Sequence, residues 1–501
     1  MHARSGAGVL SKINGDSVKC SMPCRSDPSR LPDRSETRPP VRAWAAAWLT
    51  VALVLIGAAA CSTPPASPPV RTEVPTAHDD IPLAVFYDLL ADDERAAAAL
   101  DRIDADWKDA YAAMLLDMIY FSTSPAIDAR MTRSLEKASG LRFSGDYDPF
   151  YRWLWSFDPA QHPEYSEFMA TLYGQIDPGF SEYFDDQPRS LIRLDEVLWG
   201  GVNRDGIPPL NNPDMIPASK ATYLDDDNIV FGVTVDGDAR AYPKRILAWH
   251  EMVKDQIGGR RLTGVYCTLC GAMILYDSNV GGVQHELGTS GFLYRSNKLM
   301  YDHETQSLWS TLTGEPVIGP LVGQGIELKT LPVVTTTWKE WVTRHPDTLV
   351  LSLNTGRERD YSEGAAYRDY FATDRLMFAV PKLDRRLPNK AEILALRYDG
   401  EPLGIAAAFL ERNRIYHDRV GNTEFVVLTD ASGANRVFES RGVRFERWDG
   451  ADVVIDRTGR RWLISESHLS ADDGRRLERL AAHRAFWFGW YAQFPQTRLV
   501  K

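Results

Sequence analysis

The stretch WKEWVTRHPDT, residues 338–348, returns as WFGWYAQFPQT, residues 487–497, with two Trp, one Pro and one Thr at the same spacing. Three other pairs of segments repeat in the same order: VTVDG with LRYDG, GAMILYDS with GANRVFES, and Asp302…Thr305-x-x-x-Trp309 with Asp456…Thr458-x-x-x-Trp462. The offsets fall from 163 to 162, 153 and 149, as a tandem duplication with deletions in the second copy produces. The sequence therefore predicts two copies of one module, residues 200–355 and residues 356–501.

Both copies have the character of β-structure. Runs rich in β-branched and aromatic residues, such as NIVFGVTV and LTGVYC, alternate with turn-forming pairs such as Asp236-Gly237 and Gly258-Gly259. Residues 81–199 differ, because Ala and Leu dominate there and apolar residues recur at spacings of three and four, as on helices. The predicted fold class is α+β: an N-terminal helical domain followed by the tandemly duplicated β-rich module, folded as a barrel or a sandwich.

Residues 1–61 have the pattern of an export signal. Arginines lead into the uncharged stretch AWAAAWLTVALVLIGAAA, residues 43–60, and small residues stand directly before Cys61. This arrangement is similar to a bacterial lipobox, which makes Cys61 the expected lipidation site and residues 62–80 a Pro/Ser-rich linker. The alternative is an uncleaved N-terminal transmembrane helix, because eighteen apolar residues just span a bilayer. Both interpretations predict an exported protein of the cell envelope that is anchored to the membrane.

Bulk composition narrows the function classes. The net charge is −11 and no basic stripe is present, which argues against nucleic-acid binding. Five cysteines in 501 residues are too few for a disulfide scaffold. Two of them, Cys267 and Cys270, form the Cys-x-x-Cys motif that is the candidate functional site.

The segment Cys267-Thr-Leu-Cys270-Gly271 lies between two strand-like runs, where a tight turn directs both thiols toward one point. Gly271 permits the positive φ that such a turn needs. The spacing is that of half a zinc site and also that of a thiol–disulfide redox pair. A metal site needs further ligands, and His250, 17 residues before Cys267, is the best candidate, with Zn or Cu as the metal. Glu251 then orients a ligand or acts as a base, unless it is simply exposed.

The second copy lacks these metal-binding side chains. At the offsets of the repeat, Cys267 falls on Thr429, Cys270 on Ser432 and His250 on Asn413, whereas Gly271 keeps its counterpart Gly433. The fold therefore does not require the two cysteines and the histidine, which favours a functional role for them in the first copy.

A second group of polar residues follows in SGFLYRSNKLMYDHETQSLW, residues 290–309. If its strands pair as a hairpin, several of its side chains face the same side as Cys267 and either support the site or line a pocket for a polar ligand: Ser290, Tyr294, Ser296, Asn297, Tyr301 and Asp302. No G-x-S-x-G elbow, Walker loop or dinucleotide fingerprint accompanies them, so neither a serine hydrolase nor a nucleotide enzyme is indicated.

Residues 205–352 resemble a bacterial and archaeal family of unknown function, DUF3179. The resemblance rests on DGIPPLNNP, ARAYPKRILAWHE, YCTLCG, SGFLYRSNKLMYDHETQSLWSTLTGEPVIGPLVG and TTTWKEWVTRHPDTLVLS, with Thr268 where the family tends to have Pro. The second copy looks like a degenerate tail of the same family. Because the family implies no activity, three functions stay open: a metal site, a thiol–disulfide oxidoreductase, and a non-catalytic envelope scaffold or binding protein with a structural cysteine pair. The sequence does not identify a protein partner or a small ligand.

Overall fold

A computed structural model describes residues 80–184, 188–448, 450 and 452–501. The predicted export signal, its lipidation site Cys61 and nearly all of the linker 62–80 lie outside these residues. Among the helices that the structure describes, none is both long enough and apolar enough to cross a membrane.

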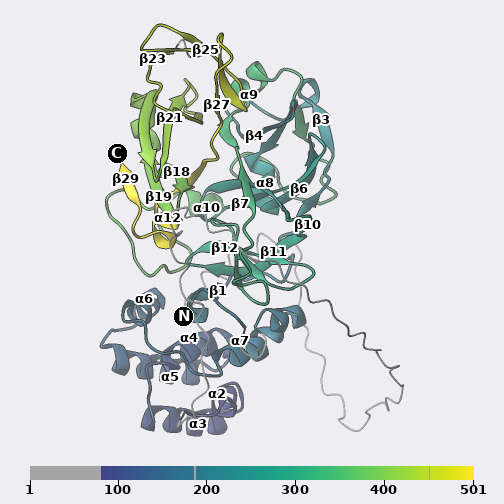
Figure 1. The fold of residues 1–501 in the computed structure, drawn as a ribbon. Coiled ribbons are helices and arrows are strands. Elements are labelled where there is room, and N and C mark those ends of the chain that lie inside the picture. Colours follow the sequence, from purple (N-terminus) through teal and green to yellow (C-terminus); the bar gives the residue numbers. More distant parts are fainter. Residues whose placement is uncertain (1–79, 185–187, 449, 451) are drawn as a thin grey trace, which may run out of the picture. The chain divides into compact units, whose positions relative to one another are not determined.

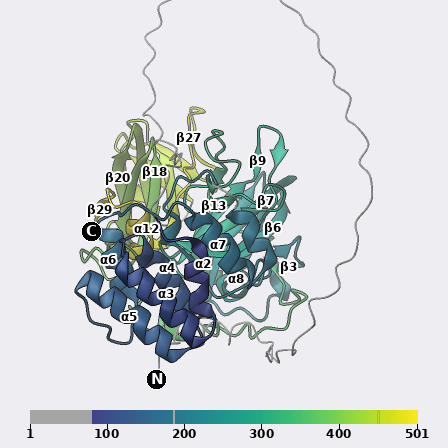
Figure 2. The ribbon, with the colours of Figure 1, turned by 90° about the horizontal axis from the view of Figure 1, so that it is seen from below.

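The predicted helical domain is confirmed as a set of short helices. They are α2 (Leu83–Tyr87), α3 (Asp93–Ala105), α4 (Tyr111–Phe121), α5 (Pro125–Ser139), α6 (Asp148–Ser156) and α7 (Tyr165–Gly174). The sequence at the two ends of helix α5 explains where the helix begins and ends. The Ser124 hydroxyl accepts a hydrogen bond from the Ile127 amide, and Pro125 occupies the first turn. Gly140 ends the helix with a φ of 71°. Helices α3 and α4 both pack against α5 (Figure 2).

The first copy of the β-module contains three five-stranded sheets and a small hairpin (Figure 1). The first sheet has the order β16 (Val334–Thr337), β4 (Ile229–Val235), β5 (Asp238–Pro243), β17 (Leu349–Leu351), β3 (Met215–Pro217). The second has the order β15 (Lys329–Leu331), β8 (Ala272–Asp277), β7 (Arg260–Cys267), β6 (Met252–Ile257), β2 (Leu210–Asn211). The third has the order β1 (Val197–Trp199), β11 (Leu287–Tyr294), β12 (Asn297–Asp302), β13 (Leu308–Ser310), β14 (Pro316–Ile318), and the hairpin is β9 (Asn279–Val280) with β10 (Val283–Gln284).

The second copy has a four-stranded, a three-stranded and a five-stranded sheet. Its first sheet has the order β28 (His483–Phe486), β18 (Glu392–Tyr398), β19 (Glu401–Ala406), β29 (Arg498–Val500). Its second has the order β20 (Ile415–Val420), β21 (Thr423–Thr429), β22 (Asn435–Glu439). Its third has the order β23 (Phe445–Trp448), β24 (Val453–Asp456), β25 (Arg461–Ile464), β26 (His468–Ala471), β27 (Arg476–Glu478). Strand for strand, β28-β18-β19-β29 matches β16-β4-β5-β17, and β20-β21-β22 matches β6-β7-β8. The Asp-Gly turns after β4 and β18 both have two positive φ angles, as two-residue hairpins require.

The repeated Trp and Thr residues have the same role in both copies. Helix α9 (Trp338–Arg344) follows β16, and helix α12 (Trp487–Gln493) follows β28. The indole of Trp341 donates to Thr348 Oγ1 at 3.0 Å, and that of Trp490 donates to Thr497 Oγ1 at 2.9 Å. Both Trp side chains are buried, so a missing Thr hydroxyl would leave a buried N–H without a partner.

The two copies share a core. Strand β28 of the second copy packs beside β8 of the first, and β16 of the first packs beside β22 of the second. The largest buried apolar cluster contains residues of both copies, among them Tyr266 and Met273 of the first and Phe486 and Trp490 of the second. Each copy therefore helps to build the surroundings of the other copy's central hairpin.

Candidate functional site

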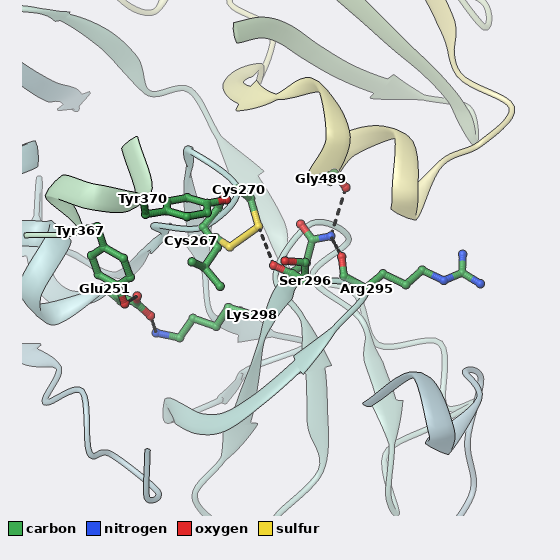
Figure 3. The surroundings of a disulfide bond; sticks show 11 residues. Glu251, Cys267, Cys270, Arg295, Ser296, Lys298, Tyr367, Tyr370 and Gly489 are labelled. Carbon is green, nitrogen blue, oxygen red and sulfur yellow. Dashed lines mark hydrogen bonds and ion pairs between the residues drawn. A yellow bond between two sulfur atoms is a disulfide. The ribbon is translucent and has the colours of Figure 1, made fainter. Parts of the chain in front are cut away.

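The two cysteines lie at the turn of the β7–β8 hairpin, and their sulfurs are bonded to each other (Figure 3). The Cys270 amide donates to the Cys267 carbonyl at 3.1 Å, and the Gly271 amide donates to the Thr268 carbonyl at 3.3 Å. Gly271 has a φ of 60°, as predicted, and a Cβ there would lie 3.0 Å from the Phe486 ring. The turn thus directs both sulfurs to one point, which is the geometry that the sequence predicted.

The second copy covers this disulfide. The Phe486 amide donates to the Cys270 carbonyl at 2.7 Å, and Gly489 of helix α12 lies against the Cys270 side chain. Cys270 Sγ lies 3.3 Å from the Ser296 carbonyl oxygen. Cys267 is 2% exposed and Cys270 is fully buried. Solvent therefore does not reach the Cys270 sulfur in this conformation.

A buried ion pair shares a cavity with Cys267. Lys298 Nζ lies 3.1 Å from Glu251 Oε2, and the Tyr367 hydroxyl donates to Glu251 Oε1 at 3.0 Å (Figure 3). Both charged side chains are more than nine-tenths buried, so Glu251 is not the exposed residue that one interpretation of the sequence allowed. Burial lowers the pKa of the Lys298 ammonium, and the Glu251 carboxylate acts against that shift. With Cys267 and Thr268, these side chains line a cavity of about 40 Å³.

His250 does not join the cysteines. Its Nδ1 lies 2.8 Å from the Pro208 carbonyl oxygen, and its Nε2 lies 2.6 Å from the Tyr361 hydroxyl. Burial lowers the pKa of its ring to about 4, so the ring is neutral near pH 7. Both nitrogens are therefore engaged by groups other than the cysteines. His250 is the last residue of helix α8 (Lys244–His250), which ends at the left-handed residue Glu251 with a φ of 55°.

The predicted metal site is therefore not assembled. No group of three or more His, Cys, Asp or Glu side chains suited to a metal ion occurs in the part of the chain that the structure describes. The two sulfurs alone fall short of the three or four protein ligands that a zinc site uses. Metal binding by the reduced pair stays a prediction.

The second predicted group is spread over several places. The Ser290 hydroxyl donates to the Leu299 carbonyl inside the β11–β12 hairpin, and the Tyr301 hydroxyl donates to Asp205. Asp302 Oδ2 pairs with His285 Nδ1 at 2.8 Å, and Tyr294 packs under the Arg295 guanidinium. Of the predicted group, Ser296 and Asn297 have contacts that bear on the disulfide, because the Ser296 carbonyl oxygen lies beside Cys270 Sγ and Asn297 Nδ2 donates to the carbonyl of Gly489. The common ligand surface expected from the sequence is not formed.

Other side chains at the site were missed by the sequence prediction. Lys298 and Tyr367 give no local signal, since each meets Glu251 only through contacts made far along the chain. Three buried polar atoms near the disulfide also lack a hydrogen-bond partner among the residues placed by the structure: Thr268 Oγ1, Ser296 Oγ and Asn297 Oδ1. The surroundings of the disulfide are thus more polar than its burial suggests.

The equivalent turn of the second copy holds charges instead of sulfur. The Tyr266 amide donates to the Glu251 carbonyl, and the Thr429 amide makes the same bond to the Arg414 carbonyl. Tyr266 therefore corresponds to Thr429, and Cys267 corresponds to the next residue, Asp430. The correspondence of Cys267 with Thr429 expected from the sequence was wrong by one position, because the second turn is one residue shorter.

Asp430 belongs to a buried ionic cluster around Arg436, whose side chain is 1% exposed. The guanidinium lies 2.9 Å from Asp430, 2.7 Å from Glu466 and 3.1 Å from Glu340. Burial alone would raise the pKa of Asp430, but the Ser432 hydrogen bond and the Arg436 charge lower it below its ordinary value. Ion pairs stabilise this turn of the second copy at the position where a disulfide closes the turn of the first copy.

Comparison with known proteins gives a family and no activity. No curated protein matches the chain, and no solved structure does. The family model described as "Protein of unknown function (DUF3179)" matches residues 204–497, which is more than half of the 501 residues. The match runs through both copies of the repeat, beyond the residues 205–352 on which the resemblance rested. The chain, with its paired copies and its single Cys-x-x-Cys turn, therefore belongs to the DUF3179 family.

Proposed function

We propose that the Cys267–Cys270 disulfide is the reaction centre of an exported thiol–disulfide oxidoreductase. The observation that carries this proposal is that Cys267 of the bonded pair shares a cavity with the buried Lys298–Glu251 ion pair. Buried charges that perturb one another beside a reactive group are typical of functional sites. The expected export signal supports the proposal, because disulfide chemistry belongs to oxidising compartments.

The proposed reaction is exchange with a dithiol on a partner protein. A partner thiolate attacks Cys267, the sulfur that lines the cavity; the S–S bond breaks, and its electron pair leaves on Cys270, which takes up a proton. The second partner thiol then attacks the mixed disulfide, and Cys267 leaves and takes up the other proton. Two partner thiols are oxidised to one disulfide, and the Cys267–Cys270 disulfide is reduced to two thiols. The reverse reaction with a partner disulfide restores the bond.

The ion pair has a defined role in this reaction. The Lys298 ammonium favours a thiolate on Cys267 over a neutral thiol, since a nearby cation lowers a thiol pKa. Glu251 holds the ammonium in place and can exchange a proton with it. Both sulfurs are covered, so Tyr367 and Phe378, which line the cavity, must move aside before a partner reaches Cys267.

Thiol trapping of the folded, full-length chain in detergent tests the proposal. The protein is equilibrated with reduced and oxidised dithiol buffers and then labelled without denaturant. Labelling of the Cys267→Ser/Cys270→Ser variant is measured in parallel and subtracted, because it reports the three other cysteines. We expect Cys267 to be labelled reversibly in the folded, reduced protein. Labelling that appears only after unfolding would mean that the disulfide has a structural role alone.

The Lys298→Met variant separates a redox role from a structural one. We expect it to raise the pH midpoint of Cys267 alkylation and to shift the thiol–disulfide equilibrium about tenfold toward the disulfide, or roughly 30 mV for two electrons. Lys298→Arg, which keeps the positive charge, should restore most of both values. Unchanged alkylation profiles in a folded Lys298→Met protein would remove the ion pair from the mechanism.

A further inference from the structure

A second cavity, of about 230 Å³, lies where the two copies meet. Ile274 of β8 and Thr330 of β15 line it from the first copy, and Arg397 of β18, His483 of β28 and Trp490 of α12 line it from the second. It is smaller than the cavities of roughly 300–1,000 Å³ that hold drug-sized ligands. A molecule of a few heavy atoms fits this volume.

His483, which lines this cavity, has a ring nitrogen without a hydrogen-bond partner among the described residues. The residue is 9% exposed, and its Nε2 has no hydrogen-bond partner among residues 80–184, 188–448, 450 and 452–501. Its ring stands edge-on to Trp490, with centroids 5.8 Å apart. Burial lowers the pKa of the ring to about 4, so it is neutral near pH 7 and one nitrogen carries a proton. A buried polar atom without a partner has lost its hydrogen bonds to water without replacement, and a bound polar group removes that cost.

Arg397 supplies positive charge at the same cavity. Its Nη2 lies 3.8 Å from Glu315 Oε1, which is close enough for an ion pair and too far for a hydrogen bond. Its Cζ lies 5.8 Å from the centroid of the Phe494 ring. Within the described chain, the guanidinium donates no side-chain hydrogen bond, so its N–H groups remain available to a ligand.

The internal repeat shows how the lining of this cavity differs from that of the equivalent interface, where a larger cavity of about 950 Å³ is lined by Thr234, Glu340 and Glu466. At the offsets of the matching strands, Ile274 corresponds to Arg436, and His483 corresponds to Val334. On the second copy's side, the Arg436 side chain and its carboxylate partners occupy the interface. On the first copy's side, the shorter Ile274 leaves space, and His483 replaces a buried apolar residue with a polar one.

We propose that this interface cavity binds a small oxyanion, held by the Arg397 guanidinium and by the His483 imidazole N–H. The shared chemistry is a compact anion with two or more oxygen acceptors. A planar guanidinium binds such an anion through two parallel N–H···O hydrogen bonds. A short-chain monocarboxylate and inorganic phosphate both have this chemistry. The site is separate from the disulfide, and the proposal holds whether or not the disulfide is redox-active.

Calorimetric titration of the full-length chain with sodium acetate and with sodium phosphate tests the proposal, against sodium chloride at equal ionic strength. We expect saturable binding of one of the two oxyanions, and the arm that saturates identifies the source. His483→Val and Arg397→Thr should each weaken binding at least tenfold. The internal repeat supplies these substitutions, since Val334 and Thr234 occupy the corresponding positions of the first copy. Arg461→Thr, at an exposed position of β25, is the charge-matched control and should change nothing.

The absence of saturation by both anions in the wild-type protein would overturn the proposal. Affinity that is unchanged in folded His483→Val and Arg397→Thr proteins would overturn it as well. Circular dichroism of each variant establishes that it is folded before its affinity is compared.

Discussion

The two hairpin turns of the β-module have the same backbone frame and opposite chemistry. In the first copy, Cys267 and Cys270 close the turn with sulfur, beside a buried Lys–Glu pair. In the second copy, Asp430 takes the place of Cys267 and joins the ionic cluster around Arg436. Each turn is covered by a helix of the other copy, α12 over the first and α9 over the second. The comparison teaches that the fold needs a buried turn at this position whose side chains are bonded or paired within the protein. A disulfide and a cluster of ion pairs both meet this need.

The largest effect should come from removing the cation of the second turn. Arg436→Met leaves Glu340, Asp430 and Glu466 buried with less positive charge, and we expect a loss of about 3–5 kcal/mol in the free energy of unfolding. Denaturant titration measures it. The control is Arg441→Met, whose side chain is 64% exposed and whose ion pair should contribute less than about 1 kcal/mol. Equal losses in the two variants would show that the buried cluster is not what holds the turn.

Asp117 shows how a buried carboxylate behaves when its hydrogen-bond partners are neutral hydroxyls and not a cation. Its oxygens accept hydrogen bonds from Tyr165 and Tyr173, and burial raises its pKa to about 7. A raised carboxyl pKa contributes stability that is complete below the unfolded value near pH 4 and is lost as pH rises through 7. We expect Asp117→Asn to gain roughly 2 kcal/mol relative to wild type between pH 5 and pH 8. A pH-independent difference in thermal unfolding would contradict this assignment.

Reducing the first turn should cost less than breaking the second. A disulfide that closes a loop of only four residues stabilises a fold by about 2 kcal/mol in the chain-entropy treatment, and longer loops give more. We therefore expect unfolding of the reduced wild type to differ from that of the oxidised protein by about 2 kcal/mol or less. The Cys267→Ser/Cys270→Ser protein should not respond to reductant. A loss as large as that of Arg436→Met would make the disulfide chiefly a structural element.

The smallest effects should be nearly equal in the two copies. Thr348→Val and Thr497→Val each remove the acceptor of a buried Trp indole, and we expect about 1–2 kcal/mol for each. Thr348 also donates to the Ala239 carbonyl, so its loss should be slightly the larger. Effects that differ several-fold in chemical denaturation would show that the copies no longer use this contact in the same way.

The fold could be predicted from the sequence wherever the signal is local or repeated. The Trp and Thr of the repeated motif recur because each pair forms one hydrogen bond, and the Asp-Gly turns recur because both residues need a positive φ. Gly271 was predicted to shape the cysteine turn, and its φ of 60° confirms this. These features depend on a few neighbouring residues, so the sequence displays them directly.

The site was less predictable because long-range contacts build it. His250 is close to the cysteines in sequence, but its two ring nitrogens meet the Pro208 carbonyl and the Tyr361 hydroxyl instead. Lys298 and Tyr367 converge on Glu251 from positions 47 and 116 residues away, and no spacing rule connects them. A single deletion in the second turn was enough to hide the match between Cys267 and Asp430.

The reduction potential of the Cys267–Cys270 pair in the folded, full-length protein tests the redox assignment most directly. We predict a reversible two-electron transition well above about −300 mV, in the range of exchangeable disulfides. A potential below that value, or a bond that resists reduction until the chain unfolds, would contradict the account and make the first turn, like the second, purely structural.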